Sequence, residues 1–177
     1  MKTMNIHLEK VTWENYLSVL KLRVNKEQRD FVASNKASLI HAFLSSSEGI
    51  PVYAFAIYNG KKVVGFMQLM YDKDWTGYER EDWLNSDAYK EYEGKPYYYI
   101  WRFMVDKKYQ KQGFGREAFK QTLDFIKTFP AGKADYCLLS YEPKNEVGKK
   151  LYASFGFEEV FLEYLHDGDE VTAMLKL

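Results

Sequence analysis

The pattern of apolar and polar residues in the first fifty positions predicts one strand and two helices. Residues 6–11 (IHLEKV) alternate between apolar and polar side chains, as in a β-strand. Apolar side chains then recur at helical spacing, at Tyr16, Leu17, Leu20 and Val24. We expect Thr12 to be the N-cap of this helix. Within residues 31–46, the apolar side chains Leu39, Ile40 and Phe43 indicate a second short helix.

The clearest strand signal is the run VYAFAIYNGKKVVGFMQLMY, which predicts a β-hairpin. Two stretches rich in β-branched and aromatic residues flank the dipeptide Asn59-Gly60. This dipeptide tolerates the positive φ angles of a type I′ turn, so we expect the turn at these two residues.

The second half of the chain continues to alternate between strands and helices. We expect a strand at 97–105, an amphipathic helix at 115–129, a strand at 136–142 and a closing hairpin joined around Asp167-Gly168. The helix at 115–129 turns Phe119, Leu123 and Ile126 towards the core. Asn145 is the expected N-cap of a further helix that runs to about Phe155, with Gly156 after its end.

Residues 72–96 interrupt this alternation of strands and helices. The segment is acidic and rich in Trp and Tyr, and we interpret it as an insertion with a short helix around 80–92. The complete pattern is β-α-α-β-β-β-α-β-α-β-β. It predicts a single α/β (α+β) domain over residues 1–177, with a mixed, mostly antiparallel twisted sheet flanked by helices.

Composition excludes several classes of protein. The chain is 46% hydrophobic and 28% charged, which is ordinary for a globular domain. Lys plus Arg and Asp plus Glu each number 25, so no net field attracts nucleic acid. No apolar run approaches the roughly 20 residues of a membrane span, and MKTMNIHLEK lacks the apolar part of a secretory signal. A single cysteine argues against a disulfide and most thiolate metal sites, so we expect no metal and a cytoplasmic location.

The stretch YQKQGFGREAF at 109–119 carries the strongest functional signal. Gly113 and Gly115 lie between a predicted buried strand and an amphipathic helix. At such a place free backbone N–H groups and the helix dipole both favour an anion. Glycine also removes Cβ atoms where the backbone must approach the anion closely. We therefore expect a phosphate-binding loop.

Two common phosphate loops do not fit this stretch. Residues 113–118 match GxGxxG/A formally, but about six residues separate the strand from Gly113, and Asp135 precedes the next strand instead of ending it. Antiparallel hairpins on both sides are also wrong for a doubly wound sheet. A Walker A loop requires Gly-Lys-Ser/Thr, which this stretch lacks.

A different spacing, Gln110-x-x-Gly113-x-Gly115, resembles the pyrophosphate loop of the GNAT family of acetyl-CoA-dependent N-acetyltransferases. The later run Asn145-x-x-Gly148-x-x-Leu151-Tyr152-x-x-Phe155-Gly156-Phe157 is similar to the second half-motif of that family. The stretches QRDFVASNKASL and YYYIWRFMVDKKYQKQGFG look more narrowly like bacterial polyamine acetyltransferases of the spermine/spermidine type. The resemblance covers most of the chain and is weakest over 72–96.

This resemblance implies acetyl-CoA as co-substrate. Backbone N–H groups at about 111–116 would bind the pyrophosphate, and the main chain of 103–105 would pair with the pantetheine arm. Asn145 would contact the cofactor, although a helix N-cap explains this residue equally well. The predicted cofactor-binding residues are Phe103, Met104, Val105, Gln110, Lys111, Gln112, Gly113, Phe114, Gly115, Arg116 and Asn145.

Acetyl transfer to an amine needs a base for the amine and a proton donor for the leaving thiolate. Tyr152 falls where the family places its general-acid tyrosine, and a core aromatic residue is the alternative interpretation. Polyamine acetyltransferases of the animal type have a carboxylate near position 101, but this chain has Trp101 and Arg102 there. Glu142, acting through water, is the candidate base, with Asp72 and Asp74 as other options. A solvated or substrate-binding carboxylate is the alternative interpretation of each.

Cys137 is the candidate nucleophile for a different mechanism, in which the acetyl group is first transferred to the enzyme. It is poorly suited to that role. Nothing in the sequence places His7, His41 or His166 beside it, and YCLLS indicates a buried strand in which cysteine is a small apolar residue. We therefore expect direct attack of the amine on acetyl-CoA in a ternary complex.

The predicted acceptor is a primary amine of a polyamine such as spermidine or spermine. Acidic and aromatic residues alternate within 72–93, and both attract a flexible polycation. The predicted substrate-binding residues of this segment are Asp72, Asp74, Glu79, Glu81 and Asp82. The resemblance to polyamine enzymes implies Glu27 and Asp30 as further ones. A solvated acidic helix explains the segment as well. A protein amine, an aminoglycoside acceptor and a non-catalytic acetyl-CoA-binding module stay open. The resemblance also implies a possible homodimer.

Overall fold

The computed structural model describes residues 4–75 and 81–177. The strands are β1 (Ile6–Lys10), β2 (Val52–Asn59), β3 (Lys62–Asp72), β4 (Tyr97–Val105), β5 (Tyr136–Tyr141), β6 (Glu158–Val160) and β7 (Val171–Lys176). The helices are α1 (Tyr16–Lys21), α2 (Asn35–Ser47), α3 (Glu81–Leu84), α4 (Asp87–Tyr92), α5 (Phe114–Ile126) and α6 (Glu146–Ala153), with the 3₁₀ turns η1 (Lys26–Phe31) and η2 (Leu162–Tyr164). Among the described residues the sheet has seven strands in the order β1-β2-β3-β4-β5-β7-β6, which confirms the predicted α/β fold.

By its internal contacts the chain divides into two compact units. Unit 1 comprises Met1–Met70 and Ile100–Pro130. Unit 2 comprises Tyr71–Tyr99 and Ala131–Leu177. Unit 1 therefore carries the predicted phosphate loop, whereas unit 2 carries Tyr152 and the acidic insertion.

The predicted hairpin forms from β2 and β3, which are antiparallel with Asn59 paired to Lys62. The turn residues are therefore Gly60 and Lys61, one position later than predicted. Gly60 has a φ of 58°, but Lys61 is not among the residues with positive φ, so the turn is not of type I′. The side chain of Asn59 has another role, because its Oδ1 accepts a hydrogen bond from the Asn5 N–H at 3.0 Å.

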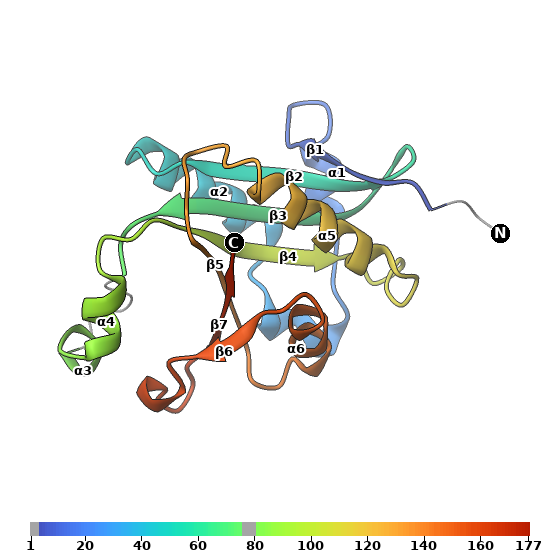
Figure 1. The fold of residues 1–177 in the computed structure, drawn as a ribbon. Helices are drawn as coiled ribbons and strands as arrows, with labels where there is room; N and C mark the ends of the chain where they lie inside the picture. Colours follow the sequence, from blue (N-terminus) through green and yellow to red (C-terminus); the bar gives the residue numbers. More distant parts are fainter. Residues whose placement is uncertain (1–3, 76–80) are drawn as a thin grey trace. The chain divides into compact units, whose positions relative to one another are not determined.

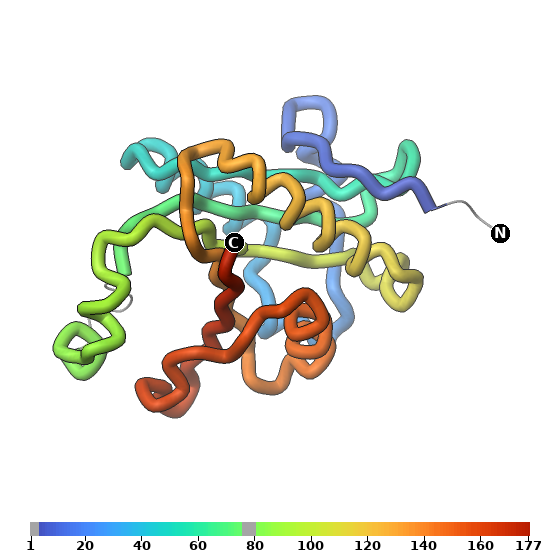
Figure 2. The backbone as a smooth tube through the Cα atoms, in the orientation of Figure 1, coloured from blue at the N-terminus to red at the C-terminus, as the bar shows by residue number. Residues whose placement is uncertain are grey.

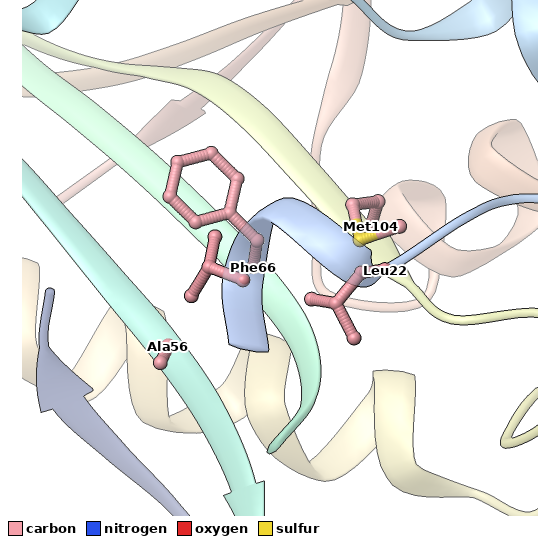
Figure 3. Close-up of a cluster of buried hydrophobic side chains, with 5 residues drawn as sticks. Leu22, Ala56, Phe66 and Met104 are labelled. Atoms are coloured by element: carbon pink, nitrogen blue, oxygen red, sulfur yellow. The ribbon is translucent and has the colours of Figure 1, made fainter. Parts of the chain in front are cut away.

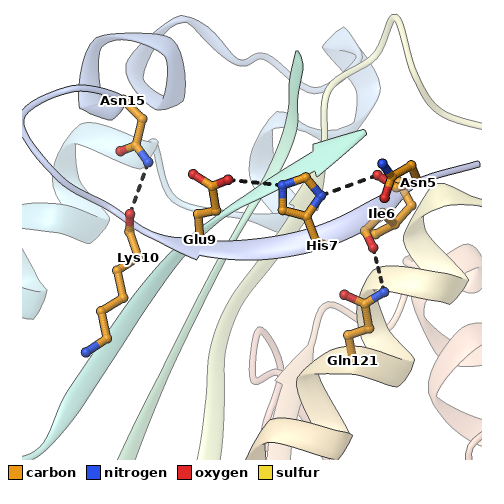
Figure 4. A network of polar contacts seen from close by, with 7 residues as sticks. All are labelled: Asn5, Ile6, His7, Glu9, Lys10, Asn15 and Gln121. Carbon is orange, nitrogen blue, oxygen red and sulfur yellow. Dashed lines mark hydrogen bonds and ion pairs between the residues drawn. The ribbon is translucent and has the colours of Figure 1, made fainter. Parts of the chain in front are cut away.

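Helix α1 begins later than predicted, and its N-cap residue is Asn15 instead of Thr12. The buried Asn15 amide accepts a hydrogen bond from the Thr12 N–H at 2.9 Å. It also donates one to the Lys10 carbonyl at 3.0 Å, as Figure 4 shows. These bonds fix the loop that follows β1, and they set the rotation of the helix. Val19 of this helix is fully buried, whereas Leu17 is 55% exposed.

An apolar cluster lies on one face of the unit 1 strands. Its side chains come from β2, β3 and β4, from α1 and from the residue that follows α1. Its buried members are Val19, Leu22, Ala56, Phe66 and Met104 (Figure 3). Gly65 of β3 is required here, because a Cβ at this position would lie 2.5 Å from the carbonyl oxygen of Met104. A substitution at Gly65 would therefore push β4 away from β3.

The predicted second helix is confirmed as α2, and its buried residues are polar. Its buried residues are Asn35 and Ser38, and the Asn35 amide donates a hydrogen bond to the Val19 carbonyl at 2.8 Å. This bond turns the polar side inward. Of the apolar residues that predicted this helix, Leu39 packs on the core cluster, whereas Ile40 and Phe43 are 49% and 72% exposed.

Helix α5 covers the other face of the unit 1 strands (Figure 1). Phe55 of β2 contacts Phe125 of α5, with ring centroids 5.0 Å apart. The next residue, Ala56, packs on the α1 side, as expected for adjacent residues of one strand. The Gln121 amide of α5 also donates a hydrogen bond to the Ile6 carbonyl of β1 at 2.7 Å (Figure 4).

The predicted core face of α5 is confirmed, because Phe119, Leu123 and Ile126 are all buried. The helix ends at Ile126, earlier than the predicted position 129. Phe129 has a φ of 52°, a left-handed conformation that cannot continue a right-handed helix.

In unit 2, β7 pairs antiparallel with both β5 and β6. Figure 2 shows the chain leaving β6, turning, and returning along β7 to the C-terminus. The closing hairpin is thus confirmed, but β6 is much shorter than the predicted run FEEVFLEYL. The strand ends at Val160 because Phe161 has a φ of 60°, and η2 follows.

The insertion contains α3 and α4 in place of one helix, because Ser86 caps α4 by accepting a hydrogen bond from the Tyr89 N–H. Trp75 is 6% exposed and donates a hydrogen bond from Nε1 to the Lys95 carbonyl at 2.6 Å. It centres a cluster with Tyr97 and Leu138, against which lie Trp83, Tyr89, Tyr92, Tyr99, Tyr136, Phe161 and Met174. Aromatic side chains of the described part of the insertion therefore pack on one another and on the rest of unit 2.

Candidate functional site

The predicted loop leaves β4 through a buried carboxylate that the sequence analysis missed. Asp106 accepts hydrogen bonds from the Arg23 N–H at 2.8 Å and from the Lys108 N–H at 2.9 Å. Its own N–H donates to the Val64 carbonyl at 2.8 Å. These three bonds tie the start of the loop to β3 and to the segment after α1. The signal available in the sequence was an acid that directly follows an apolar strand.

Gln110 ties the same loop to η1. Its Nε2 donates hydrogen bonds to Gln28 Oε1 at 2.9 Å and to the Val105 carbonyl at 3.0 Å. Its Oε1 accepts a hydrogen bond from Asn25 Nδ2 at 3.0 Å. The side chain of this predicted cofactor-binding residue is thus engaged within unit 1, where it shapes the loop.

Gly113 is the N-cap residue of α5, with a φ of 82° and no side chain to cap the helix. Lys111 also has positive φ, 59°. An α-helix leaves its first N–H groups without intrahelical partners, so the first turn of α5 offers donors to an external acceptor. Left-handed residues before an uncapped helix are the backbone arrangement found in many phosphate-binding loops.

Gly115 has no conformational need to be glycine. It is the second helical residue of α5, and a Cβ built there would meet only Val105 Cγ2, at an ordinary contact distance of 3.5 Å. The structure therefore tolerates alanine at this position. A ligand that approaches the backbone closely would explain the missing side chain.

The charge around the loop is positive. Lys107, Lys108, Lys111 and Arg116 are exposed, whereas the nearby Asp106 is buried. Coulomb attraction from these cations adds to the helix dipole in favouring a polyphosphate.

The predicted residues on β4 lie next to this loop. Phe103 packs on Phe119 of α5, with ring centroids 5.2 Å apart, and Met104 is in the core cluster. Val105 accepts the Gln110 hydrogen bond through its carbonyl. The side chains of these residues belong to the fold of unit 1, so any contact with a cofactor would come from their main chain.

In unit 2, Tyr152 lies on α6 beside two other aromatic rings. Its ring centroid is 5.5 Å from that of Tyr141 and 6.4 Å from that of Phe157. Burial, with the charges of Glu170 and Tyr99, raises the pKa of Tyr152 to about 12. The hydroxyl therefore keeps its proton at neutral pH, as a proton donor requires.

A polar chain of unit 2 was also missed from the sequence. Tyr99 of β4 shares a hydrogen bond with the Ser140 hydroxyl of β5. Ser140 Oγ donates to Glu170 Oε2 at 2.7 Å. The three residues are far apart along the chain, so only the pairing of the strands brings them together.

Asn145 is confirmed as the N-cap of α6, and its Oδ1 accepts the Gly148 N–H at 3.0 Å. A Cβ at Gly148 would lie 2.7 Å from Asn145 Nδ2, so the spacing Asn145-x-x-Gly148 serves this cap. Glu142 follows β5 directly, and its carbonyl accepts a hydrogen bond from the Asn145 N–H at 2.8 Å. Both predicted site residues thus lie in the turn that leads into α6.

Cys137 is fully buried in β5. Burial raises the pKa of its thiol far above the ordinary value, so the thiolate needed for nucleophilic attack does not form at neutral pH. The expectation that Cys137 is a structural residue is consistent with this environment.

The predicted acceptor-binding carboxylates are distributed over both units. In unit 1, Glu27 and Asp30 are exposed on η1. In unit 2, Asp72 accepts hydrogen bonds from the N–H groups of Lys73 and Asp74 and so forms a tight turn.

The remaining acids lie in or near α3. Asp74, Glu81 and Asp82 are exposed, and Asp82 lies 3.3 Å from His166 Nε2. Glu79 falls outside the described residues. The exposed acids can attract a cation, whereas the Trp75 ring is buried.

In the described residues, no group of three or more His, Cys, Asp or Glu side chains is arranged to hold a metal ion. Over the same ranges, none of the helices is both long enough and apolar enough to span a membrane.

The loop, the uncapped helix and Tyr152 can be compared with known proteins. The sequence model of the acetyltransferase (GNAT) family matches residues 13–157. The chain belongs to the GNAT acetyltransferase family. It is an acetyl-CoA-dependent N-acetyltransferase, which confirms the predicted reaction class and co-substrate.

Solved structures with the same fold include several GNAT enzymes. The PaiA N-acetyltransferase from Thermoplasma acidophilum, in complex with coenzyme A, is 14% identical with a TM-score of 0.62, over 98% of this chain and 100% of that one. AtaTR bound with acetyl-CoA is 17% identical with a TM-score of 0.63, over 97% and 93%. Naa50 from Arabidopsis thaliana, in complex with a bisubstrate analogue, is 17% identical with a TM-score of 0.57, over 97% and 99%. A search of curated proteins found no significant match.

Proposed function

We propose that this GNAT enzyme transfers the acetyl group of acetyl-CoA to a primary amine of a polyamine, such as spermidine or spermine. The pyrophosphate binds the N–H groups at 111–116, and the main chain of 103–105 pairs with the pantetheine arm. The observation that carries the cofactor part is the left-handed Gly113 at the uncapped start of α5, with exposed cations around it.

Tyr152 protonates the thiolate that leaves when the amine attacks. The support for this role is its position in the family half-motif and a pKa raised to about 12 by burial. The amine attacks acetyl-CoA directly, because the buried Cys137 is no nucleophile.

A carboxylate receives the proton that the ammonium form of the acceptor must lose. Glu142, next to β5, is the candidate from sequence, and Glu170, bonded to Ser140, is the candidate from structure.

Several carboxylates attract the polycation. Glu27, Asp30, Asp72, Asp74, Glu79, Glu81 and Asp82 are the proposed contacts. Each exposed ion pair contributes only about 0–1 kcal/mol, so preference for a polyamine requires several of them at once. A protein amine or an aminoglycoside would use fewer of these charges.

We place this reaction in the cytoplasm, with residues 1–177 acting as one catalytic domain and the enzyme assembling as a homodimer, as the family resemblance implies. The mass of the purified enzyme by light scattering tests the dimer.

The release of free thiol from acetyl-CoA, measured with a panel of amines, tests the function. The panel contains spermine, spermidine, a simple monoamine, an aminoglycoside and a peptide with a free N-terminus. We expect rapid thiol release with the two polyamines and acetylated product by mass spectrometry. Transfer to the peptide or the aminoglycoside alone would replace the polyamine with that acceptor. Tight acetyl-CoA binding without release of thiol would indicate a binding module.

A further inference from the structure

The polar chain of unit 2 has a defined direction. The Ser140 hydroxyl has one proton, and it donates that proton to Glu170 Oε2 at 2.7 Å. In the bond between Tyr99 and Ser140, Tyr99 must therefore be the donor. The chain runs from the Tyr99 hydroxyl through the Ser140 hydroxyl to the Glu170 carboxylate.

The Tyr99 oxygen is an acceptor once its proton is directed at Ser140. An alkylammonium ion has a pKa of about 10.4 and only N–H donors, so it must lose a proton before it can attack at neutral pH. An ammonium N–H that donates to the Tyr99 oxygen would complete a path on which each proton moves by one hydrogen bond. The path ends on a carboxylate, the only charged acceptor in this chain of three groups.

We propose that Glu170 receives the proton of the acceptor ammonium through Ser140 and Tyr99. This inference rests on the proposed function and assigns the base of that reaction. The ammonium N–H bond breaks as an O–H bond to Tyr99 forms, Tyr99 passes its own proton to Ser140, and Ser140 passes its proton to Glu170. The ammonium becomes a neutral amine, and the carboxylate becomes a carboxylic acid.

The remaining steps balance without another reactant. The nitrogen lone pair attacks the thioester carbonyl, and the C–S bond breaks with its electron pair on sulfur. Tyr152 protonates the sulfur, and its phenolate takes the second nitrogen proton as the amide forms. One proton leaves in total, from Glu170 to solvent.

The groups that meet Glu170 come from three elements. Ser140 of β5 binds it directly, Tyr99 of β4 lies behind Ser140, and the charge of Glu170 acts on Tyr152 of α6. In this proposal the Tyr99 oxygen is the group that contacts the ammonium, whereas Ser140 and Glu170 act through it. For Glu142, the contact that the described residues show in the turn is made by its main-chain carbonyl.

The test compares Glu170→Gln and Ser140→Ala with Glu163→Gln, an exposed carboxylate of η2 that serves as the control. The readout is kcat/KM for spermine between pH 6 and 10, with folding checked by circular dichroism. We expect the first two variants to be about 10²–10⁴-fold slower than the unaltered enzyme at pH 7. Their deficit should shrink about tenfold per pH unit, because the free amine grows in that proportion below its pKa.

A structural role for Glu170 would lower the rate by the same factor at every pH, and that result would overturn the relay. Equal rates for Glu170→Gln and Glu163→Gln would overturn it too, and a selective loss in Glu142→Gln would move the base to that residue. If Glu170→Gln fails to fold, Ser140→Ala decides alone, since it breaks the path and keeps the carboxylate. Absence of transfer by the unaltered enzyme to every amine of the panel would contradict the proposed function itself.

Discussion

Gly113 and Gly115 have different structural roles, although both are glycine positions of the same sequence motif. Gly113 adopts a φ of 82°, which a residue with a side chain reaches at a cost of about 1–2 kcal/mol. Gly115 is helical with room for a Cβ. The spacing in the sequence pointed to both residues. Only the backbone angles show that the fold requires glycine at 113, whereas at 115 glycine would be required only by a bound ligand.

Gly115→Ala therefore tests the cofactor site without damage to the fold. The melting temperature should be unchanged or higher, because alanine is a better helix former than glycine by about 0.5–1 kcal/mol. The Kd for acetyl-CoA, by calorimetry, should rise about tenfold or more, which corresponds to about 1.4 kcal/mol. Gly113→Ala is the contrast, since it should lower the melting temperature. An unchanged Kd in Gly115→Ala would mean that the phosphates bind elsewhere.

Tyr152→Phe should reduce kcat by about 10²–10⁴-fold and leave KM for acetyl-CoA nearly unchanged, because only the proton donor is removed. Tyr141→Phe is a matched control on the neighbouring ring, whose hydroxyl binds Glu159 at 2.6 Å. That control should keep kcat. Equal effects of the two substitutions in steady-state assays would assign Tyr152 to packing.

Tyr99, Ser140 and Glu170 could not have been found from the sequence. They are separated by 41 and 30 positions, and no local motif contains them. Tyr152 was accessible because a local family motif includes it, and Asp106 could have been noticed as an acid at a strand end. Contacts that depend on strand pairing require the structure.

At the scale of elements, the strands and α5 were predictable because their apolar pattern is strong. The apolar patterns of α1 and α2 predicted that these helices exist but not which residues they bury, and hydrogen bonds of the buried Asn15 and Asn35 help to set that face. In a short helix with few apolar residues, such hydrogen bonds determine which side faces the core more than the spacing of its apolar residues does. The insertion was recognised as a break in the strand rhythm, but the sequence did not show that its aromatic residues form a cluster.

That cluster predicts a structural role for the insertion. Trp75→Ala removes a 6% exposed ring that stacks on Tyr92, with centroids 4.9 Å apart. We expect a loss of about 3–5 kcal/mol in the free energy of unfolding, measured with urea. Trp13→Ala is the control, because Trp13 is 86% exposed and should cost little. Comparable stability of the two variants would show that the cluster does not hold the insertion.

At the scale of the whole molecule, buried tyrosines link stability to alkaline pH. Burial raises the pKa of Tyr97, Tyr141 and Tyr152 in the folded chain. Their hydroxyls keep their protons when the unfolded chain begins to lose them near the ordinary value of about 10. The stability that they contribute is complete below pH 10 and is lost as the pH rises through the folded values.

The free energy of unfolding in urea should therefore fall between pH 9.5 and 11. The slope approaches about 1.4 kcal/mol per pH unit for each tyrosine that stays protonated. Tyr97→Phe should have a smaller slope, because one such group is gone. A free energy that is constant over this range would contradict the buried state of these hydroxyls.

The central claim is acetyl transfer to a polyamine by attraction between ammonium groups and carboxylates. Its most direct test is kcat/KM for a monoamine, a diamine and spermine at low and high salt, in the unaltered enzyme and in a Glu81→Gln, Asp82→Asn double variant. We expect kcat/KM to rise along the series. Salt should raise KM for spermine far more than KM for acetyl-CoA, since exposed pairs are screened within about 10 Å at 0.1 M. The double variant should flatten the series at unchanged KM for acetyl-CoA. A series that is flat in the unaltered enzyme, or that favours a neutral amine over spermine, would contradict the claim.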